Sequence, residues 1–443
     1  MERNISFNLK NWKENKKRKP LILLGARQVG KTYLLKNFGK ENFSKYLYVN
    51  FEEKKELCKL FTEDLDPKRI LSELEIYFNA EIDLKNDLII LDEIQECPEA
   101  ISSLKYFSEV IPELATCSAG SLLGVKLGMG SFPVGKVELV NMFPMSFFEF
   151  LKAINELKLL KYLLNWNPSE KFSSTVHSKA WDLFKTYLVV GGLPESILVY
   201  KEHQANKNKA LAEVRKSQQN LIKTHLADIA KHSGKQNSMH IERIWSNIPS
   251  QLAREQDGTA TKFKFKGVIP NVKGYSRLAD TIDWLQAAGL ILRIPISNSG
   301  NLPLKAFTDE NSFKLYLYDV GILGALSSLE PSVILNYDYG TYKGYFAENF
   351  IAQEFTCAMG QPDEIFAWKK AKSEIEFLRV VKDSVIPIEV KSGWNTRSRS
   401  INVFIEKYDS PYGIIFSASD FTQNQKNKIR RLPLYLASRF PSD

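Results

Sequence analysis

One eight-residue segment constrains the fold more than any other part of the chain. It fits the pattern G-x-x-x-x-G-K-[ST] and consists of Gly25, Ala26, Arg27, Gln28, Val29, Gly30, Lys31 and Thr32. An apolar run at 21–24 precedes it, and a helical stretch at 33–38 follows it. Such a loop surrounds phosphate groups with backbone N–H groups, so glycine is needed where the chain turns tightly. We therefore expect a phosphate-binding loop between a buried strand and a helix.

All eight residues of this loop are expected to contact ATP. Lys31 supplies a positive charge to the β- and γ-phosphates and counts as a catalytic residue, while the hydroxyl of Thr32 is a ligand for Mg²⁺. The helix that follows directs the positive end of its dipole at the anion. Arg27 lies inside the loop and is a further candidate for phosphate contact. ATP and Mg²⁺ are thus the expected cofactors.

A second apolar strand, at 88–91, carries two acids at its carboxyl end, Asp92 and Glu93. Ligands of parallel α/β sheets bind beyond the carboxyl ends of the strands. We expect Asp92 to hold Mg²⁺ through its water shell and Glu93 to polarise the attacking water as a catalytic residue. After the next strand, Ser118 or Ser121 is a candidate sensor of the γ-phosphate, with a simple turn as the alternative.

The spacing of apolar runs predicts four domains, at 1–150, 151–239, 240–311 and 312–443. Alternating strands and helices in the first predict a parallel sheet covered by helices, an α/β fold. The pattern of the second is helical. In the third, helices at 241–252 and 276–288 and a strand at 290–296 follow in the order of a winged helix. Strands return in the fourth around a helix at 342–358, which predicts a second α/β domain.

Acidic residues and a lysine share strand faces near the C-terminus. Glu389 and Lys391 alternate along one strand, and Glu374 and Glu376 alternate along the preceding one, so each pair points to one side. A hairpin would bring these side chains together, and Glu348 on a helix could complete the group. Such a cluster can bind Mg²⁺ and activate water for phosphodiester cleavage. A solvated hairpin face with ordinary ion pairs has the same pattern, so both interpretations stay open.

The net charge of +9 favours a polyanionic partner such as nucleic acid, although basic residues also keep a protein surface soluble. Lys262, Lys264 and Lys266 alternate with aromatic residues, and Lys273 and Arg277 follow. In a strand the three alternating lysines would lie on one face, where they could meet DNA. A solvated face accounts for the same pattern.

The rest of the composition indicates the expected compartment. Hydrophobic residues make up 44% of the chain, which argues against a disordered protein. The cysteines, at 58, 97, 117 and 357, form no Cys-x-x-Cys pair, so we expect neither a disulfide framework nor a zinc site. No apolar run reaches membrane-spanning length, and no signal-peptide pattern opens the sequence. We therefore expect a cytoplasmic protein that makes no membrane contact.

Several segments together resemble a family of prokaryotic AAA+ ATPases that end in a restriction-endonuclease-like domain. They lie at 25–32, 91–95, 143–150, 191–195, 314–323 and 388–391, and the later ones are more specific to the family than the first two. The resemblance covers nearly the whole chain. It implies a P-loop AAA+ nucleotide-binding domain, a helical and winged-helix middle, and a terminal α/β domain similar to PD-(D/E)xK nucleases.

The nuclease motif has one departure in this chain. The resemblance places Glu376 where aspartate is usual, with Glu389 and Lys391 at the remaining motif positions and Glu348 as the helical acid. Glu376 and Glu389 are then the implied metal ligands. Glutamate is longer than aspartate by one methylene, and Mg²⁺ tolerates little change in ligand reach. We therefore expect a nuclease-like fold, weak metal binding, and slow or absent cleavage.

Two functions follow from these patterns. The first is a magnesium-dependent ATP hydrolase that couples its nucleotide state to a nucleic-acid-facing C-terminal domain. The second is a nucleotide-gated switch or scaffold whose nuclease-like domain is catalytically dead. DNA-stimulated turnover favours the first, and tight ATP binding with negligible turnover favours the second. We leave open a homo-oligomer, because one sequence does not identify an arginine finger from a neighbouring subunit.

Overall fold

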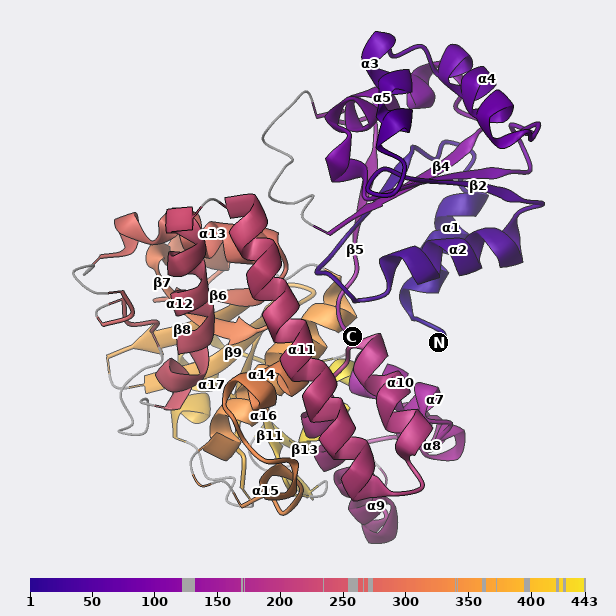
Figure 1. The fold of residues 1–443 in the computed structure, drawn as a ribbon. Helices are drawn as coiled ribbons and strands as arrows, with labels where there is room; N and C mark the ends of the chain where they lie inside the picture. The colour runs from indigo at the N-terminus through magenta and orange to yellow at the C-terminus, as the bar shows by residue number, and fades with distance from the viewer. Residues whose placement is uncertain are drawn as a thin grey trace. The chain divides into compact units, whose positions relative to one another are not determined.

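The chain divides into two compact units (Figure 1). The computed structural model describes residues 1–121, 132–168, 170, 172–233, 235–253, 262–265, 267–269, 274–338, 340, 342–360, 364–371, 373–393, 399–419, 422–424 and 428–441. Unit 1 comprises Met1–Phe143 and the short segment Ala287–Gly289, and unit 2 comprises Pro144–Gln286 and Leu290–Asp443.

Unit 1 contains a five-stranded sheet in which all neighbouring strands are parallel. Its strands are β1 (Leu21–Leu24), β2 (Tyr46–Asn50), β3 (Leu88–Asp92), β4 (Ala115–Gly120) and β5 (Glu138–Asn141). They lie in the order β2-β3-β4-β1-β5, and each neighbouring pair is parallel. The predicted parallel sheet is confirmed, and the chain leaves β1 and β3 at the same edge.

Helices cover both faces of this sheet. Figure 1 shows α1 (Ile5–Glu14) and α2 (Lys31–Asn42) on one face and α3 (Lys59–Glu63), α4 (Pro67–Phe78) and α5 (Pro98–Val110) on the other. Short 3₁₀ turns, η1 (Lys55–Cys58) and η2 (Ile94–Glu96), precede α3 and α5. Leu74 and Leu104 pack with Ile89 and Leu91 of β3 in one apolar core. Because helices cover both faces, every residue of β3 is buried, which explains its unbroken apolar run.

Unit 2 begins with the predicted helical region. Its helices are α7 (Phe147–Ala153), α8 (Leu157–Asn165), α9 (Ser174–Val190), α10 (Pro194–His203), α11 (Lys207–Ser233) and α12 (Lys235–Ala253). α7 starts with a capping box, in which Ser146 and Glu149 each accept a hydrogen bond from the backbone N–H of the other. Among the described helices, none combines the length and hydrophobicity that a membrane span requires.

The remainder of unit 2 is built on a mixed eight-stranded sheet, in the order β12-β13-β11-β10-β9-β8-β6-β7. The strands are β6 (Ile291–Ser297), β7 (Thr308–Leu317), β8 (Ile365–Lys370), β9 (Ser373–Val381), β10 (Ser384–Val390), β11 (Gly413–Ser417), β12 (Thr422–Asn424) and β13 (Ile429–Pro433). The helices are α13 (Ala279–Ala287), α14 (Val320–Leu326), α15 (Pro331–Leu335), α16 (Tyr342–Met359) and α17 (Ser400–Tyr408), with 3₁₀ turns η3 (Tyr275–Arg277), η4 (Leu304–Phe307) and η7 (Leu434–Arg439). β9 and β10 form the expected antiparallel hairpin.

The strand that was expected to form the wing of a winged helix belongs to this sheet. β6 is antiparallel to β7 and parallel to β8, so it extends the terminal sheet. The predicted domain boundary after residue 311 falls inside β7. Local spacing does not reveal which sheet a strand joins, because β8 lies much further along the chain. The four-part division of the chain otherwise stays a prediction.

The buried carboxylate of Asp319 forms hydrogen bonds with three parts of unit 2: the turn after α9, the start of α14, and α16. Asp319 has no exposed surface, and its Oδ2 accepts hydrogen bonds from the backbone N–H of Gly192 at 2.6 Å and from Gln353 at 3.5 Å. Its Oδ1 accepts from the N–H of Ile322 at 3.1 Å and so caps α14. Gly191, with φ at 72°, lies so close that a Cβ would collide with this carboxylate. Burial raises the pKa of Asp319 to about 6, although the hydrogen bonds from the backbone of Gly192 and Ile322 limit the rise.

Two cysteines that were expected to be unpaired form a disulfide in unit 1. Cys58 and Cys97 are separated by 39 positions, and their sulfur atoms lie 2.15 Å apart. Cys58 ends η1 and Cys97 precedes α5, so tertiary folding rather than local spacing brings them together. The expectation that the chain has no disulfide is therefore wrong for this pair. Cys117 and Cys357 take no part in a disulfide.

We predict that Asp319→Asn flattens the pH dependence of stability. The pKa of the folded carboxyl, about 6, is above the ordinary value of 3.8, so the folded state binds the proton more tightly. The resulting stabilisation of the folded state is fully present below pH 4 and is lost as pH rises through 6. For a pKa shift of this size, the free energy of unfolding changes by about 3 kcal/mol. Urea unfolding followed by tryptophan fluorescence from pH 4 to 7 should show the wild type losing free energy of unfolding relative to the variant.

The control is Asp309→Asn, which changes an exposed carboxylate on β7. Its pH profile should run parallel to that of the wild type. If Asp319→Asn also runs parallel, Asp319 does not titrate between these pH values in the folded protein.

Candidate functional site

The glycine-rich loop between β1 and α2 has an unusual backbone. Gly25, Gln28 and Gly30 have positive φ angles of 149°, 62° and 98°, a region that glycine enters without strain. A Cβ at Gly25 would also collide with the carbonyl group of Met142. Both glycines of the motif are therefore required by the path of the chain, and the loop turns directly into the N-terminus of α2.

Lys31 is the first residue of α2 and its side chain folds back into the loop. Its ammonium donates to the carbonyl oxygens of Gly25 and Ala26, both at 2.8 Å, and the residue is 7% exposed. Burial lowers the pKa of Lys31 to about 8, while the nearby carboxylates of Glu93 and Asp92 limit the decrease. Lys31 makes no ion pair with a carboxylate of the described residues. A phosphate oxygen would supply that anionic partner.

Thr32 and Asp92 meet although 60 positions separate them. The hydroxyl of Thr32 donates to Asp92 Oδ2 at 2.7 Å, and the hydroxyl of Tyr48 donates to the same oxygen at 2.8 Å. Asp92 is 2% exposed, and its Oδ1 accepts from the N–H of Glu93 at 3.0 Å. A threonine hydroxyl and a carboxylate are oxygen ligands of the kind that Mg²⁺ prefers, so this pair fits the predicted magnesium site.

One oxygen of the Glu93 carboxylate, Oε2, accepts hydrogen bonds from two side chains. Gln95 donates to Glu93 Oε2 at 2.5 Å and the hydroxyl of Ser121 donates to it at 3.3 Å. Arg27, from the glycine-rich loop, donates to the Ser121 hydroxyl at 3.2 Å. Of the two serines considered as phosphate sensors, Ser121 contacts this network, whereas Ser118 lies inside β4 with no exposed surface.

Tyr48 and Gln95 were not identified from the sequence. Tyr48 reaches Asp92 because β2 is the neighbour of β3, in a register that pairs Asn50 with Asp92. The signal for Gln95 was its position two residues after Glu93, but a sequence does not show that the chain turns back there.

A second group of ionisable side chains lies in unit 2, where β7, β9, β10 and α16 meet. Lys391 pairs with Glu389 at 2.6 Å, and Lys314 pairs with both Glu348 and Glu374 at 3.5 Å. The acids and lysine that the sequence placed on shared strand faces are therefore close together. Lys314, which is 3% exposed, was not predicted to take part. A lysine inside the apolar strand of 313–318 was the signal that could have indicated it.

Glu376 belongs to the same group. Its Oε2 accepts a hydrogen bond from the N–H of Val390 at 3.3 Å. Although part of the side chain reaches solvent, the dense protein around the carboxyl raises the pKa of Glu376 to about 8, and repulsion from Glu389 and Glu348 adds to this. The hydroxyl of Tyr316, also unpredicted, donates to Glu348 at 2.7 Å. Carboxylates crowded in this way are stabilised by a proton, a lysine or a metal cation.

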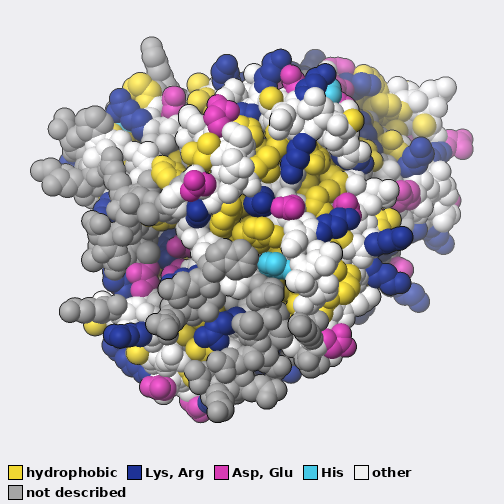
Figure 2. Space-filling model, turned by 90° about the horizontal axis from the view of Figure 1, so that it is seen from below, with side chains coloured by type: hydrophobic (Ala, Val, Ile, Leu, Met, Phe, Trp, Pro, Cys, Tyr) yellow, Lys and Arg dark blue, Asp and Glu magenta, His cyan; other side chains and the backbone are white. Residues whose placement is uncertain are grey.

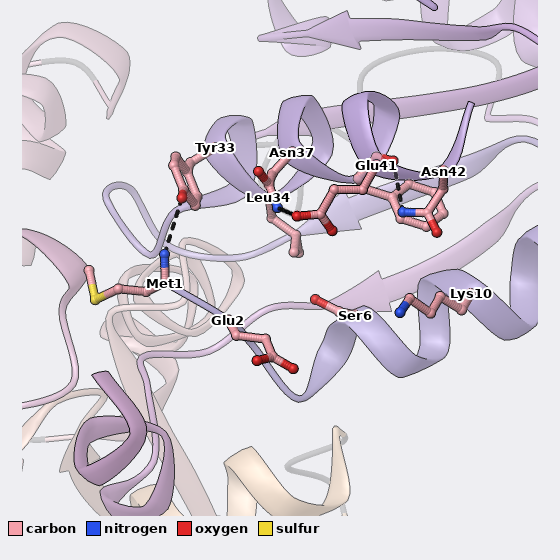
Figure 3. Close-up of a pocket in the computed structure, with 10 residues that line it drawn as sticks. Met1, Glu2, Ser6, Lys10, Tyr33, Leu34, Asn37, Glu41 and Asn42 are labelled. Carbon is pink, nitrogen blue, oxygen red and sulfur yellow. Dashed lines mark hydrogen bonds between the residues drawn. The ribbon is translucent and has the colours of Figure 1, made fainter. Parts of the chain in front are cut away.

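A cavity of about 430 Å³ lies between α1 and α2 in unit 1 (Figure 3). Its lining is mostly polar: the amino group of Met1 donates to the hydroxyl of Tyr33 at 3.1 Å, and Asn37 donates to Glu41 at 2.7 Å. Figure 3 shows Tyr33, Asn37 and Glu41 along one side of α2. None of the residues predicted to bind ATP lines this cavity, so it is separate from the phosphate loop.

Comparison with known families agrees with the geometry of unit 1. Residues 17–151 match a model described as an AAA domain. The chain therefore carries an AAA-type P-loop domain, that of a nucleotide-binding ATPase. Residues 182–333 and 343–437 match models described as domains of unknown function, DUF8612 and DUF4143. These two descriptions name no activity for unit 2. A search of curated proteins finds no match to the sequence.

Two solved structures resemble this chain at low sequence identity. A Walker-type ATPase of Pyrococcus abyssi is 18% identical, with a TM-score of 0.44, over 72% of this chain and 94% of the other. The ORC1 protein of Aeropyrum pernix, in complex with DNA, is 12% identical, with a TM-score of 0.31, over 74% of this chain and 93% of the other. With scores this low, neither similarity adds to the assignment.

We predict that Lys31→Ala weakens ATP binding by at least about tenfold, because a hydrogen bond to a charged group contributes about 1.5–3 kcal/mol. Titration calorimetry with Mg²⁺-ATP measures this directly. Lys40→Ala, an exposed position on the same helix, should bind as the wild type does. Unchanged affinity in a folded Lys31→Ala protein would rule out the glycine-rich loop as the phosphate site.

Proposed function

We propose that this chain is a magnesium-dependent ATP hydrolase. The contact between the Thr32 hydroxyl and the Asp92 carboxylate, at 2.7 Å, is the observation that carries this proposal. It joins the end of the glycine-rich loop to the acidic end of β3, with Lys31 and Glu93 beside it. These residues would supply a phosphate-binding cation, a magnesium site and a water-orienting acid at one edge of one sheet, which is what phosphoryl transfer to water requires.

Each residue of this group has a distinct task. Lys31 offsets negative charge on the phosphates, and the N–H groups of the loop and of the start of α2 surround them. Thr32 and Asp92 would hold Mg²⁺, which would supply charge neutralisation to the phosphates. Glu93 accepts a hydrogen bond from the attacking water and orients it. Because Glu93 acts on the water rather than on the nucleotide, its effect falls on turnover more than on binding.

We further propose that unit 2 faces nucleic acid and that the nucleotide state of unit 1 is coupled to it. The net charge of +9 supports a polyanionic partner. Residues 262–265 do not form the expected strand, but Phe263 packs over Phe313 of β7, while Lys262 is partly exposed and Lys264 is exposed, so both lysines are accessible to a polyanion. Lys266 and Lys273 lie outside the described residues. On the face seen in Figure 2, visible lysine and arginine side chains are interspersed with acidic and apolar ones, so contact would be local.

The ionisable group of unit 2 supports a second candidate function, a weak metal site. Glu376 and Glu389 would be its ligands, and Lys391 lies beside them. Lys391 already pairs with Glu389, and Lys314 with Glu348 and Glu374. A metal would therefore have to compete with ammonium groups for carboxylates. This competition favours weak binding and slow or absent phosphodiester cleavage, as in a nuclease-like domain that has lost its chemistry.

Glu93→Gln should bind ATP as the wild type does but hydrolyse it at least about tenfold more slowly, since loss of a general base costs a hundredfold or more in many enzymes. Phosphate release and titration calorimetry measure the two quantities. Glu63→Gln, an exposed acid of unit 1, is the matched control. An unchanged kcat would remove Glu93 from the mechanism.

The same assay tests the proposed coupling. Single- or double-stranded DNA added to the wild type should raise ATP turnover, and the increase should diminish with salt because phosphate contacts are electrostatic. Tight ATP binding with negligible turnover and no response to DNA would instead support the switch or scaffold.

Crystals soaked in Mn²⁺ should show weak anomalous density between Glu376 and Glu389, and Glu389→Gln should abolish it, because Mn²⁺ prefers carboxylate oxygens. Glu364→Gln, an exposed acid just before β8, should leave the density unchanged. DNA should be cleaved slowly or not at all. Absence of density would exclude the metal site, and rapid metal-dependent cleavage that is lost in Lys391→Ala would contradict the inactive interpretation.

A further inference from the structure

Gln95 makes a close contact with the proposed catalytic acid. It lies on η2, two residues after Glu93, and is 4% exposed. Its side-chain amide donates to Glu93 Oε2 at 2.5 Å. The proposed roles of the loop, of Asp92 and of Glu93 leave this glutamine without a task.

The contact follows from a sharp turn of the chain. Glu93 has a φ of 48°, in the left-handed region that residues other than glycine seldom adopt. The N–H of Glu96 donates to the carbonyl of Glu93 at 2.9 Å, and Ile94 between them is fully buried. The turn therefore directs the side chain of Gln95 back toward that of Glu93. A conformation that costs energy is kept where the surrounding structure requires it, which is common at functional sites.

A second donor acts on the same oxygen. The Ser121 hydroxyl donates to Glu93 Oε2 at 3.3 Å, and Arg27 donates to that hydroxyl at 3.2 Å. Among the described residues, none forms a hydrogen bond with Oε1, the other oxygen of Glu93. One oxygen is thus anchored from two directions, and no residue in the described part of the chain competes with water for the other.

We propose that Gln95 is a positioning residue for ATP hydrolysis: its amide fixes Oε2 of Glu93 so that Oε1 can orient the attacking water. This inference rests on the proposed ATP hydrolysis. A carboxylate on a flexible side chain samples several rotamers, and only one directs an oxygen at a given water. Gln95 restricts that freedom without contacting nucleotide. The Ser121 and Arg27 contacts extend the same restraint to the phosphate loop.

The decisive variant is Gln95→Met, which keeps the length and approximate volume of the side chain but removes the donor. It should lower kcat for ATP by roughly tenfold, the equivalent of a hydrogen bond to a charged group, while the dissociation constant for ATP changes less than about twofold. Ser121→Ala, which removes the longer bond, should have a smaller effect. Ser103→Ala, a buried serine of α5 bonded to a backbone carbonyl, is the control and should leave kcat unchanged.

A double-mutant cycle separates positioning from packing. If Gln95 acts through Glu93, Gln95→Met in a Glu93→Gln background should cause no further loss of kcat, whereas a packing role would make the two losses add. Gln95→Leu repeats the cycle with a second apolar side chain. Additive losses, an unchanged kcat in Gln95→Met, or ATP affinity that falls in parallel with kcat in both variants would overturn the inference alone. A wild type that does not hydrolyse ATP, or a Glu93→Gln variant with unchanged kcat, would overturn the proposed function as well.

Discussion

The hydrogen bond between Thr32 and Asp92 depends on the order of strands in unit 1. β1 and β3 are not neighbours, since β4 lies between them, yet all three run parallel and end at one edge. The loop after β1 and the acids after β3 therefore reach the same place from positions 60 residues apart. Tyr48, in the middle of β2, and Ser121, directly after β4, join from the two strands that flank β3. The site is a consequence of parallel strand ends, and a change in strand order would disperse it.

Several segments that make this sequence resemble a known family have structural tasks in unit 2. Glu354, a residue of α16 with no exposed surface, accepts a hydrogen bond at 2.7 Å from the backbone N–H of Phe147 at the start of α7. Burial raises the pKa of Glu354 to about 8. Asp319 holds the turn at Gly191 and Gly192 in a similar manner. In both cases a buried carboxylate satisfies backbone N–H groups that would otherwise lack partners. The hydrogen bonds at Phe147, Gly192 and Asp319 therefore stabilise the fold of unit 2.

The sequence alone was sufficient to predict structure that depends on neighbouring residues. The glycine-rich loop is continuous, and its strand, turn and helix can be predicted from neighbouring residues. Tyr48, Gln95 and Lys314 were not predicted, because their contacts depend on strand register or on a turn in the left-handed region. β6 was misassigned for a related reason, since its partner β8 is distant in the chain. The Cys58–Cys97 pair likewise depends on tertiary contact.

The two groups of charged residues differ in how their charges are balanced. In unit 1, the ammonium of Lys31 is bonded to carbonyl oxygens and makes no ion pair with a described carboxylate, so an anion would add a partner without displacing one. In unit 2, Lys391 and Lys314 already neutralise Glu389, Glu348 and Glu374. A metal bound by Glu376 and Glu389 would compete with Lys391 for Glu389, in an ion pair that is partly shielded from water and so harder to replace. The same kinds of residue thus favour ligand binding in unit 1 and oppose it in unit 2, which makes nucleotide chemistry the better supported activity of this chain.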